Sequence, residues 1–468
     1  MRSLPLPSFV AVAALLGCSA TETLAPVPNF VAGELLVLKE NGGYCWFEDE
    51  RAIVDGAHIL VGTVAGTTDD HGTIGDLDVT DFDLTSRTST TFTLHPELEA
   101  DDHDSPSLLL LPGGRYLAMY TRHASDRLMR WRVSRRAHDA SAWEPEQTLE
   151  IPGPLGVTYS NTFVLPAEGD RVYNFHRAQD QNAFVMTAPP EVPGFELTGR
   201  LLDWDPTATG ADPAKVTGIT TLTRPYVRYA SNGVDTIHFA TTEDHPSAYD
   251  NSIYHGFVRG GAVHDSFGAV VDPSLGDDSA ASPVELTRVY EGDADHVAWT
   301  TDIEIDDSGH PYLAFSVQRD GAATRGVAMV GGLDHRYHYA RFDGSKWHVH
   351  EMAYAGTRLH AGQDDYTGLV ALDPRDPDTV YLSTNADPAT GDPLVSNADG
   401  ERHHEIFRGR TRDRGASWVW TPLTANSTTD NLRPIIPRWP GHTALLWLRG
   451  QYRTMHKYRQ NVVGLIDP

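Results

Sequence analysis

Cysteine and lysine are both scarce in this chain of 468 residues. The two cysteines, Cys18 and Cys45, are too few for a scaffold held by several disulfides. Lysine occurs only at positions 39, 215, 346 and 457, so arginine supplies nearly all of the positive charge. After residue 30, no segment is apolar over the roughly 18 residues that a membrane-spanning helix requires. Helical periodicity is also rare, because 41 glycines and 30 prolines interrupt nearly every candidate helix.

Positive charge is in deficit over the chain as a whole. The 64 acidic residues outnumber the 37 basic ones and give a formal net charge of −27. The long-range field of such a protein repels phosphate backbones, so we expect no nucleic-acid partner. Hydrophobic residues make up 40% and charged residues 22% of the chain, which is ordinary for a folded protein and excludes disorder throughout.

The first 29 residues are typical of an export signal. Arg2 precedes the apolar run Phe9–Leu16, which is too short to span a membrane as a mature helix. The run ends in Leu-Leu-Gly before Cys18, similar to a bacterial lipobox, which implies cleavage before Cys18 and lipidation of its thiol. We therefore expect an exported lipoprotein of the outer membrane or cell surface, and an ordinary signal peptide with an incidental cysteine is the alternative. The expected division is a signal peptide at 1–17, a lipidated tether at 18–29 and a folded domain at 30–468.

One short pattern, a Gly, Pro or Asp turn followed by an apolar strand, recurs seven times. Equivalent positions in the seven strands are Ile59, Tyr116, Val172, Thr236, Tyr312, Val380 and Ala444. Their spacings of 57, 56, 64, 76, 68 and 64 residues suit four-stranded blades repeated around an axis. We therefore predict an all-β, seven-bladed β-propeller in a single domain. Its ring would close where residues 35–38 and 462–466 share one blade.

Two pairs of polar residues are predicted to meet at the same end of neighbouring blades. In the hairpin centred on residue 113, cross-strand partners have numbers that sum to 226, which pairs His103 with His123. In the next hairpin, centred on residue 168, partners sum to 336, which pairs Tyr159 with Arg177. Opposed side chains in such hairpins lie roughly 5 Å apart at Cβ. The four side chains are therefore expected to converge on one face, across the groove between two blades.

The equivalent ends of the other blades are rich in arginine, histidine and aromatic side chains. The residues expected there are Cys45, Trp46, Arg224, Tyr226, His296, Arg319, Asp365, Asn385, Arg433 and Arg449. A basic canyon on an acidic body indicates an anionic ligand that arginines bind at short range, with Arg224 among them. Each of these residues also has an ordinary structural alternative: histidines in surface turns, Tyr159 in packing, and Arg177 paired with a carboxylate.

Longer stretches of the sequence carry a family resemblance. They include GGYCWFEDERAIVDG, HDSPSLLLLPGGRYLAMYTRH, YSNTFVLPAEGDRVYNFHRAQDQN and NLRPIIPRWPGHTALLWLRG. Over most of the chain after residue 30, the sequence resembles the BNR-type propeller proteins that include the ulvan lyases. The resemblance implies that His103 and Tyr159 act as an acid–base pair, with His123 in support. It also implies that Arg177 and Asn182 hold a uronate carboxylate, although the Arg-to-Asn gap is one residue longer here than in the family.

The implied activity is that of a polysaccharide lyase. Such an enzyme removes the C5 proton of a uronic acid and expels the 4-linked sugar by β-elimination, which leaves an unsaturated uronyl product. The expected substrate is a sulfated, uronate-containing polysaccharide of the ulvan type. An arginine and an amide stabilise the charge that develops on the carboxylate, while histidine and tyrosine transfer protons in either assignment. This chemistry requires no metal or other cofactor.

A structural metal ion is a separate question. His245, His255 and His264 follow at near-regular spacing in the fourth blade, and Cys45 is a possible soft ligand for zinc. The spacing matches no compact zinc motif, so neither zinc nor calcium is assigned ligands here.

Two other functions fit parts of the sequence. A sialidase-like glycoside hydrolase shares an arginine-rich propeller, but its Arg-Ile-Pro signature is absent and only one Asp-box turn, Thr411–Trp418, is strong. A non-catalytic glycan-binding surface lipoprotein would use the canyon for binding alone. In each case we expect a monomer.

Overall fold

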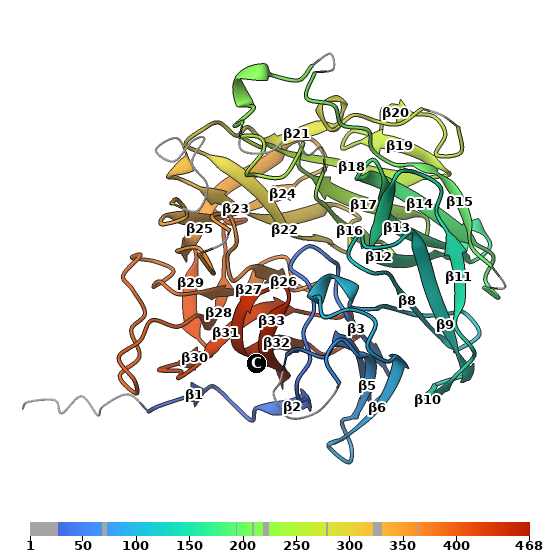
Figure 1. The fold of residues 1–468 in the computed structure, drawn as a ribbon. Helices are drawn as coiled ribbons and strands as arrows, with labels where there is room; N and C mark the ends of the chain where they lie inside the picture. Colours follow the sequence, from blue (N-terminus) through green and yellow to red (C-terminus); the bar gives the residue numbers. More distant parts are fainter. Residues whose placement is uncertain are drawn as a thin grey trace, which may run out of the picture.

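Each of the seven recurrent segments forms the second strand of an antiparallel sheet, as the spacing predicts. The sheets follow one another around a common axis as the blades of a seven-bladed β-propeller (Figure 1). This computed structural model describes residues 27–67, 73–192, 194–207, 210–218, 224–277, 279–321, 330–361 and 363–468. The predicted signal peptide and Cys18 lie outside the described residues.

The first strand of each blade lies innermost, as the contacts between first strands of neighbouring blades show. Blade one contains β3 (Ala52–Asp55), β4 (His58–Val64), β5 (Leu77–Asp83) and β6 (Thr88–His95), and blade two contains β7 (Ser107–Leu110), β8 (Tyr116–Tyr120), β9 (Leu128–Arg136), β10 (Asp139–Trp143) and β11 (Gln147–Glu150). Blade three contains β12 (Leu155–Leu165), β13 (Arg171–Gln179), β14 (Asn182–Ala188) and β15 (Glu196–Arg200). Blade four contains β16 (Val227–Ser231), β17 (Thr236–Thr241), β18 (Ile253–Arg259), β19 (Ala262–Asp265), β20 (Val270–Asp272) and β21 (Thr287–Tyr290).

Blades five to seven complete the ring. Blade five contains β22 (Val297–Ile305), β23 (Pro311–Gln318), β24 (His335–Phe342) and β25 (Trp347–Gly356). Blade six contains β26 (Val370–Leu372), β27 (Thr379–Thr384), β28 (Glu405–Arg410) and β29 (Val419–Pro422). Blade seven contains β31 (Asp430–Ile435), β32 (Ala444–Thr454), β33 (Lys457–Ile466) and β2 (Leu36–Lys39). A small separate sheet pairs β1 (Phe30–Val31) with β30 (Thr424–Ala425). Short 3-10 helices connect some strands: η1 (Asp102–Asp104), η2 (Pro166–Glu168), η3 (Pro213–Lys215) and η4 (Pro283–Glu285). None of the described helices is long and apolar enough to cross a membrane.

The ring closes as the sequence predicts. The N-terminal strand β2 adds to the edge of the last blade by pairing with β33, with Leu36 opposite Gly464 and Val37 opposite Val463. Both ends of the chain therefore share one sheet, so the closing blade cannot form from either end alone. The backbone hydrogen bonds between β2 and β33 therefore close the ring.

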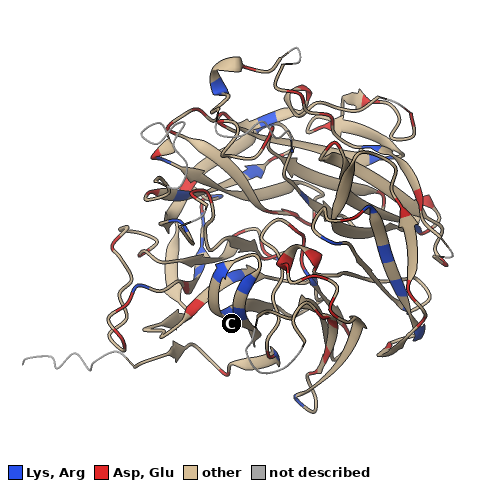
Figure 2. Cartoon of the chain, in the orientation of Figure 1, with Lys and Arg blue, Asp and Glu red and all other residues tan. Residues whose placement is uncertain are grey.

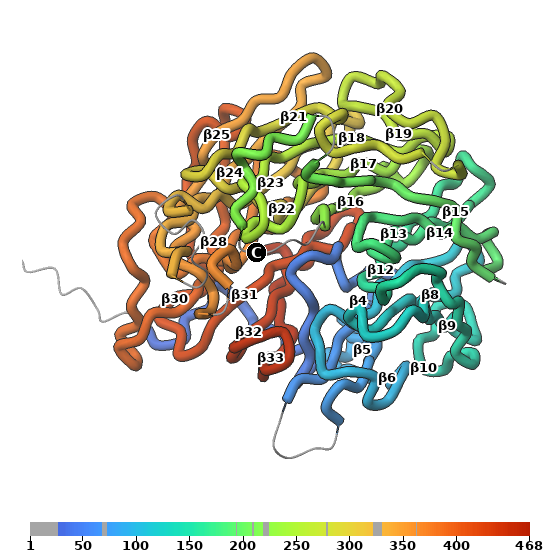
Figure 3. The backbone as a smooth tube through the Cα atoms, turned by 45° about the horizontal axis from the view of Figure 1, so that its top comes forward, coloured from blue at the N-terminus to red at the C-terminus, as the bar shows by residue number. Residues whose placement is uncertain are grey.

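The chain between β2 and β3 fills the middle of the ring. We call residues 44–51 the axial segment; Figure 3 shows this blue stretch running in among the innermost strands. Trp46 Nε1 donates to the Thr367 carbonyl at 2.7 Å, beside blade six. Buried arginines of blades four and seven, Arg228 and Arg433, both donate to the carbonyl of Glu48. The segment thus links blades that are far apart in sequence and forms the floor beneath one face of the propeller.

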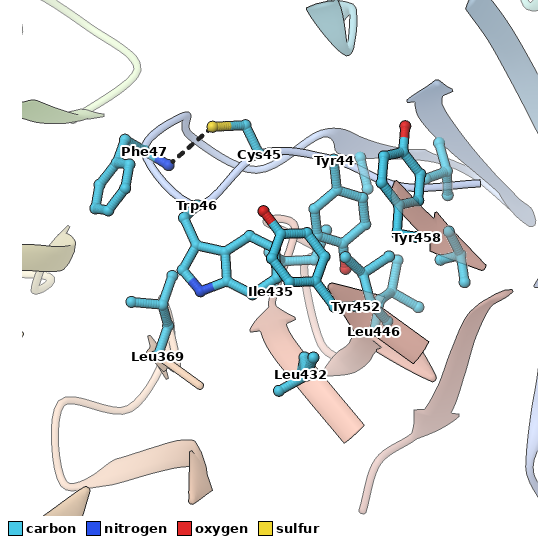
Figure 4. Packing of buried hydrophobic residues seen from close by; sticks show 14 of the residues in the cluster. Tyr44, Cys45, Trp46, Phe47, Leu369, Leu432, Ile435, Leu446, Tyr452 and Tyr458 are labelled. Carbon is cyan, nitrogen blue, oxygen red and sulfur yellow. Dashed lines mark hydrogen bonds between the residues drawn. The ribbon is translucent and has the colours of Figure 1, made fainter. Parts of the chain in front are cut away.

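The axial segment also carries the core of that face. Trp46 packs against Tyr452 with ring centroids 4.4 Å apart, and Phe47 stacks on Trp299 at 4.0 Å. Figure 4 shows Trp46, Phe47 and Tyr452 together with Cys45, whose sulfur accepts a 3.4 Å hydrogen bond from the Phe47 backbone nitrogen. Large aromatic side chains bury much apolar area, so they stabilise a segment that has no regular secondary structure.

Candidate active site

One carboxylate positions the two histidines that the hairpin spacing pairs. Asp101 precedes η1 and accepts hydrogen bonds from the backbone nitrogen of His103 at 3.0 Å and from its Nδ1 at 2.6 Å. The other carboxylate oxygen lies 2.8 Å from Nδ1 of His123. The two imidazoles stack with centroids 3.9 Å apart and an angle of 6° between their planes. Asp101 therefore fixes the orientation of both rings at once.

The stacked histidines differ in charge. Burial disfavours the charged form of His103, but negative charge around the ring, with the Asp101 carboxylate bonded to its Nδ1, outweighs burial and raises the pKa of His103 well above the ordinary value. Burial and the charge of His103 lower the pKa of His123 to about 4. Two imidazolium rings in contact repel each other strongly, so the pair shares a single positive charge near neutral pH. That charge resides on His103, and His123 is neutral.

The second predicted pair meets through an irregular strand. Strand β12 places Thr158, not Tyr159, opposite Arg177, and the register shifts between Thr158 and Asn161. Tyr159 itself has a φ of +70°, which is uncommon for a residue other than glycine and marks local strain. Its ring nevertheless lies 4.7 Å from the guanidinium carbon of Arg177 and 5.6 Å from the His103 ring. The bulge therefore brings the phenol to the histidine pair.

Arg177 is a buried cation without a carboxylate partner. Its relative exposure is 6%, yet no carboxylate of the described residues lies within ion-pair distance of it. Its Nη1 has no hydrogen-bond partner in the same part of the chain. Its guanidinium carbon lies 5.5 Å from the Tyr226 ring, and Arg177 lines a small hollow together with Tyr159 and Pro225. An unpaired buried charge is costly, so this position favours an anionic ligand.

The two tyrosines beside Arg177 have opposite acidities. Burial raises the pKa of Tyr159 well above the ordinary value, and its hydroxyl has no hydrogen-bond partner among the described residues. Burial also acts on Tyr226, but the charges of Arg224 and Arg177 outweigh it and lower its pKa. Tyr226 is thus the more readily ionised phenol of the two.

Arg224 stands beside this group at the start of blade four. Its backbone nitrogen donates to Asp244 at 3.1 Å, and its half-buried side chain has no carboxylate within ion-pair distance in the described structure. After burial, Arg224 is the largest influence that lowers the pKa of His245, which lies 5.5 Å from the Tyr226 ring. The positive charges of Arg224 and Arg177 therefore act on the same buried region.

Asn182 occupies a structural position instead. Its amide nitrogen donates to Asp203 at 3.2 Å, and its amide oxygen accepts a hydrogen bond from the Trp204 backbone nitrogen at 2.9 Å. Both ends of the amide are thus engaged in the link that leaves blade three. The structure brings together His103, His123, Tyr159, Arg177 and Arg224, and leaves Asn182 outside this group.

Most of the other cations expected in the canyon are neutralised or structural. Arg433 donates to the Cys45 carbonyl, and Arg449 donates to Asn29 and Asn431. Arg319 lies 3.2 Å from a carboxylate oxygen of Glu351. Among the residues expected here, the free positive charge is therefore concentrated at Arg177 and Arg224. Fewer of these arginines are available to an anionic ligand than the sequence suggests.

Sequence reasoning missed Asp101, the residue that holds both histidines. The signal was its place two residues before His103, where an Asp side chain can cap a turn by accepting the nitrogen of residue i+2. Tyr226 was recognised only as one aromatic of the canyon. Its position between two arginines depends on contacts between blades that spacing within one hairpin does not reveal.

The histidines considered for zinc do not meet. His245 Nδ1 bonds to Ser247, His255 lies between His238 and Ser266, and His264 stacks on Phe257. Cys45 lies instead in the axial segment, where its thiol contacts His103. The predicted soft ligand is therefore next to the candidate catalytic histidine.

Solved structures with the same fold include enzymes that act on polysaccharides. A polysaccharide lyase of family PL25, described as an ulvan lyase bound to -[GlcA(1-4)Rha3S]-, aligns with a TM-score of 0.65 and 13% identity, covering 92% of this chain and 96% of that one. A second structure of a PL25 ulvan lyase aligns equally well at 14% identity. The polysaccharide lyase Uly1 aligns with a TM-score of 0.54 and 10% identity, covering 94% of this chain and 99% of that one.

Sequence comparison is more specific about the family. No curated protein sequence matches the chain. The profile described as BNR repeat-containing family member matches residues 73–355, which hold the histidine pair, both tyrosines and both unpaired arginines. Because this match covers more than half of the 468 residues, the chain belongs to the BNR repeat-containing family.

Proposed function

We propose that the protein is a polysaccharide lyase that cleaves a sulfated, uronate-containing glycan of the ulvan type by β-elimination. Support comes from the shared fold of the PL25 and Uly1 lyases and from the chemistry of the groups at His103 and Arg177. At 10–14% identity the fold alone does not fix a substrate, so the argument rests on the site.

The buried, unpaired guanidinium of Arg177 is the observation that carries this proposal. The C5 proton of a uronate becomes acidic enough to remove only when the adjacent carboxylate is neutralised. A guanidinium provides two parallel hydrogen bonds to a carboxylate, and in a buried site these strengthen as negative charge develops. Arg177 therefore binds the uronate carboxylate in our proposal, and Arg224 adds positive charge from the neighbouring blade.

His103 is suited to be the general acid. Its raised pKa keeps it protonated at neutral pH, so it has a proton to give to the departing glycosidic oxygen. Asp101 holds the ring in place and stabilises its charged form. His123 supports the ring by stacking and shares the same carboxylate.

A tyrosine then serves as the base. Tyr159 has an unpartnered hydroxyl close to His103, but its pKa is raised, whereas the pKa of Tyr226 is lowered by the two arginines. A base must lose its own proton before it can take one from C5, so Tyr226 is the better base in the free site. Tyr159 then orients the substrate oxygen or passes the proton, within reach of both Arg177 and His103.

A panel of uronate polysaccharides, with ulvan first, tests this proposal through the ultraviolet absorbance of the unsaturated product. A lyase gives rising absorbance, and His103→Ala should lower kcat by roughly 10²–10⁴-fold. Asp343→Asn is a matched control, because it removes a carboxylate that holds His348 at the opposite end of blade five. New reducing ends without absorbance would mean hydrolysis, and binding without cleavage would mean a glycan-binding protein. Either result would overturn the proposal.

A further inference from the structure

The hairpin tip of the last blade carries a high density of positive charge for so acidic a chain. Strands β32 and β33 are joined at residues 455–456, and four basic side chains lie within seven residues there: Arg453, His456, Lys457 and Arg459. Lys457 is one of only four lysines in the whole chain. Figure 2 shows blue segments of this hairpin next to the red of η1. The tip therefore departs from the charge balance of the molecule as a whole.

Three of these cations share one face of the hairpin. Side chains alternate between the two faces of a strand, and the cross-strand pair Tyr452–Tyr458 defines the face that is turned inward. Both tyrosines are buried, whereas Arg453, Lys457 and Arg459 are exposed on the other face. In the described part of the chain, no carboxylate lies within ion-pair distance of these three side chains. Their charges are therefore available to a ligand.

The tip lies against the candidate active site. The Met455 carbonyl accepts a hydrogen bond at 3.1 Å from the backbone nitrogen of Asp102, the residue before His103. Nδ1 of His456 lies 3.2 Å from Oδ2 of Asp101, the carboxylate that positions the histidine pair. The His456 side chain is 59% exposed, so its ring borders both the site and the solvent. A ligand bound at His103 therefore has the charged tip as its neighbour.

These cations are suited to a different anion from the one that Arg177 binds. Arg177 is buried, and its single guanidinium suits one carboxylate that takes part in the reaction. The side chains of Arg453 and Lys457 are exposed at the end of long flexible stems, so they suit an anion that stays partly hydrated. A sulfate ester is such an anion, because it remains ionised throughout the physiological pH range and presents three oxygens to several donors.

We propose that the tip of the β32–β33 hairpin binds a sulfate group on a sugar next to the reacting uronate, through Arg453 and Lys457. The inference rests on the proposed function for the identity of the polymer, and it names the part of the site that selects sulfated chains. A polymer held at Arg177 and His103 extends beyond the reacting sugar, so its next sugars pass over neighbouring loops. Arg459 adds positive charge to the same face of the hairpin. The contact binds ground state and transition state alike, so it acts on KM and not on kcat.

The first experiment measures binding without turnover. Retardation is compared in gels that contain dextran sulfate, native ulvan or chemically desulfated ulvan, at about 0.15 M salt, where the Debye length is about 8 Å. The double variant Arg453→Gln/Lys457→Gln should bind the sulfated polymers roughly 2- to 30-fold more weakly than the wild type, the range expected for two exposed ion pairs. On desulfated ulvan it should match the wild type. His456 is left unchanged in this test because its ring contacts Asp101.

A second double variant controls for the change in net charge. Arg410 and Arg412 are exposed, and no carboxylate of the described structure lies within ion-pair distance of them. They lie at the turn between the third and fourth strands of blade six, whereas the tip joins the second and third strands of blade seven, at the opposite end. Arg410→Gln/Arg412→Gln removes the same two charges and should bind every polymer as the wild type does. Equal weakening by both double variants, or undiminished binding of sulfated polymers by the folded hairpin variant, would refute the site; the single variants Arg453→Gln and Lys457→Gln repeat the test if the double variant melts early.

The second experiment measures the consequence for turnover. On native ulvan the hairpin variant should raise KM by a similar factor and keep kcat within about twofold, while on desulfated ulvan its KM should equal that of the wild type. An equal rise of KM on both polymers would show attraction to any polyanion, and a fall in kcat alone would show an effect on the catalytic histidines; either result overturns the proposal. If no polymer yields product absorbance, the lyase proposal fails, while gel retardation still judges the sulfate contact.

Discussion

Replacing Asp101 with asparagine tests how one carboxylate controls the histidine pair. The carboxylate receives Nδ1 of His103 on one oxygen and Nδ1 of His123 on the other, at 2.6 and 2.8 Å. An asparagine side chain keeps the shape but has only one acceptor oxygen, so one imidazole must lose its partner or change tautomer. A hydrogen bond to a charged group contributes about 1.5–3 kcal/mol. At about 1.4 kcal/mol per factor of ten, Asp101→Asn should lower kcat by roughly 10- to 150-fold.

The assay is the absorbance of the unsaturated product under saturating substrate, with Asp343→Asn as the control. That control also removes a carboxylate from a histidine, at 2.7 Å from His348 Nε2, but at the other end of the strands. The kcat of Asp343→Asn should stay within about twofold of the wild-type value, because Asp343 contacts neither imidazole of the site. If Asp101→Asn also kept kcat within twofold, the carboxylate would not govern proton transfer and the reasoning would fail.

The same substitution predicts a stability change that depends on pH. Asp101 has a lowered pKa in the folded state, so its contribution is present above about pH 4 and is lost as the pH falls. His103 has a raised pKa, so its contribution is present below about pH 6.5 and is lost as the pH rises through the folded value. Thermal melting of both proteins should therefore differ most between about pH 4 and 6.5, and least at alkaline pH. An equal difference at pH 5.5 and 9 would contradict this charge assignment.

Three further outcomes follow from the site. Arg177→Lys should remain severely impaired in kcat/KM because an ammonium loses the two-pronged contact with a carboxylate, and wild-type kcat/KM would show that only charge matters there. Tyr226→Phe should lower kcat more than Tyr159→Phe, because only the phenol of Tyr226 has a lowered pKa; the reverse order in steady-state assays would exchange their roles. The chain carries a formal net charge of −27, with acidic residues spread around the ring (Figure 2), so kcat/KM on a polyanion should first rise with salt. At about 0.5 M salt the Debye length is roughly 4 Å, which removes long-range repulsion and spares close contacts; a steady fall from the lowest salt would refute this account.

The blades were predictable because their pattern is local. Each second strand follows a tight turn, and the spacing of turns along the chain determines how many hairpins form. The closing contact of β2 with β33 followed from the same reasoning, because two apolar strands at the chain ends had no partner of their own. The pairing of His103 with His123 also depended only on one hairpin, and the rings meet although neither residue lies within a strand.

The remaining site residues depend on contacts that local patterns do not encode. Tyr159 adopts a left-handed backbone conformation without a glycine to announce it, so the expected register across from Arg177 was wrong by one residue. The axial segment has no strand periodicity, and its bonds reach as far as Arg433, 388 residues from Cys45. Asp101 belongs to an acidic run that resembles a solvated surface in sequence, yet it is 1% exposed. Burial, more than residue type, determined which of these charged groups were available for chemistry.

The axial segment and the closing strand both belong to the first 51 residues, which has a consequence for biosynthesis. A ribosome releases β2 and residues 44–51 long before β31 to β33, which they must meet in the finished ring. During translation the early segment has no site to occupy, and its Trp46 and Phe47 side chains remain without the partners that bury them. Such long-range closure makes folding slow and leaves apolar surface exposed in the interval. Catalytic competence should therefore appear only after the last blade has been made, as a single late event in the life of each newly synthesised chain.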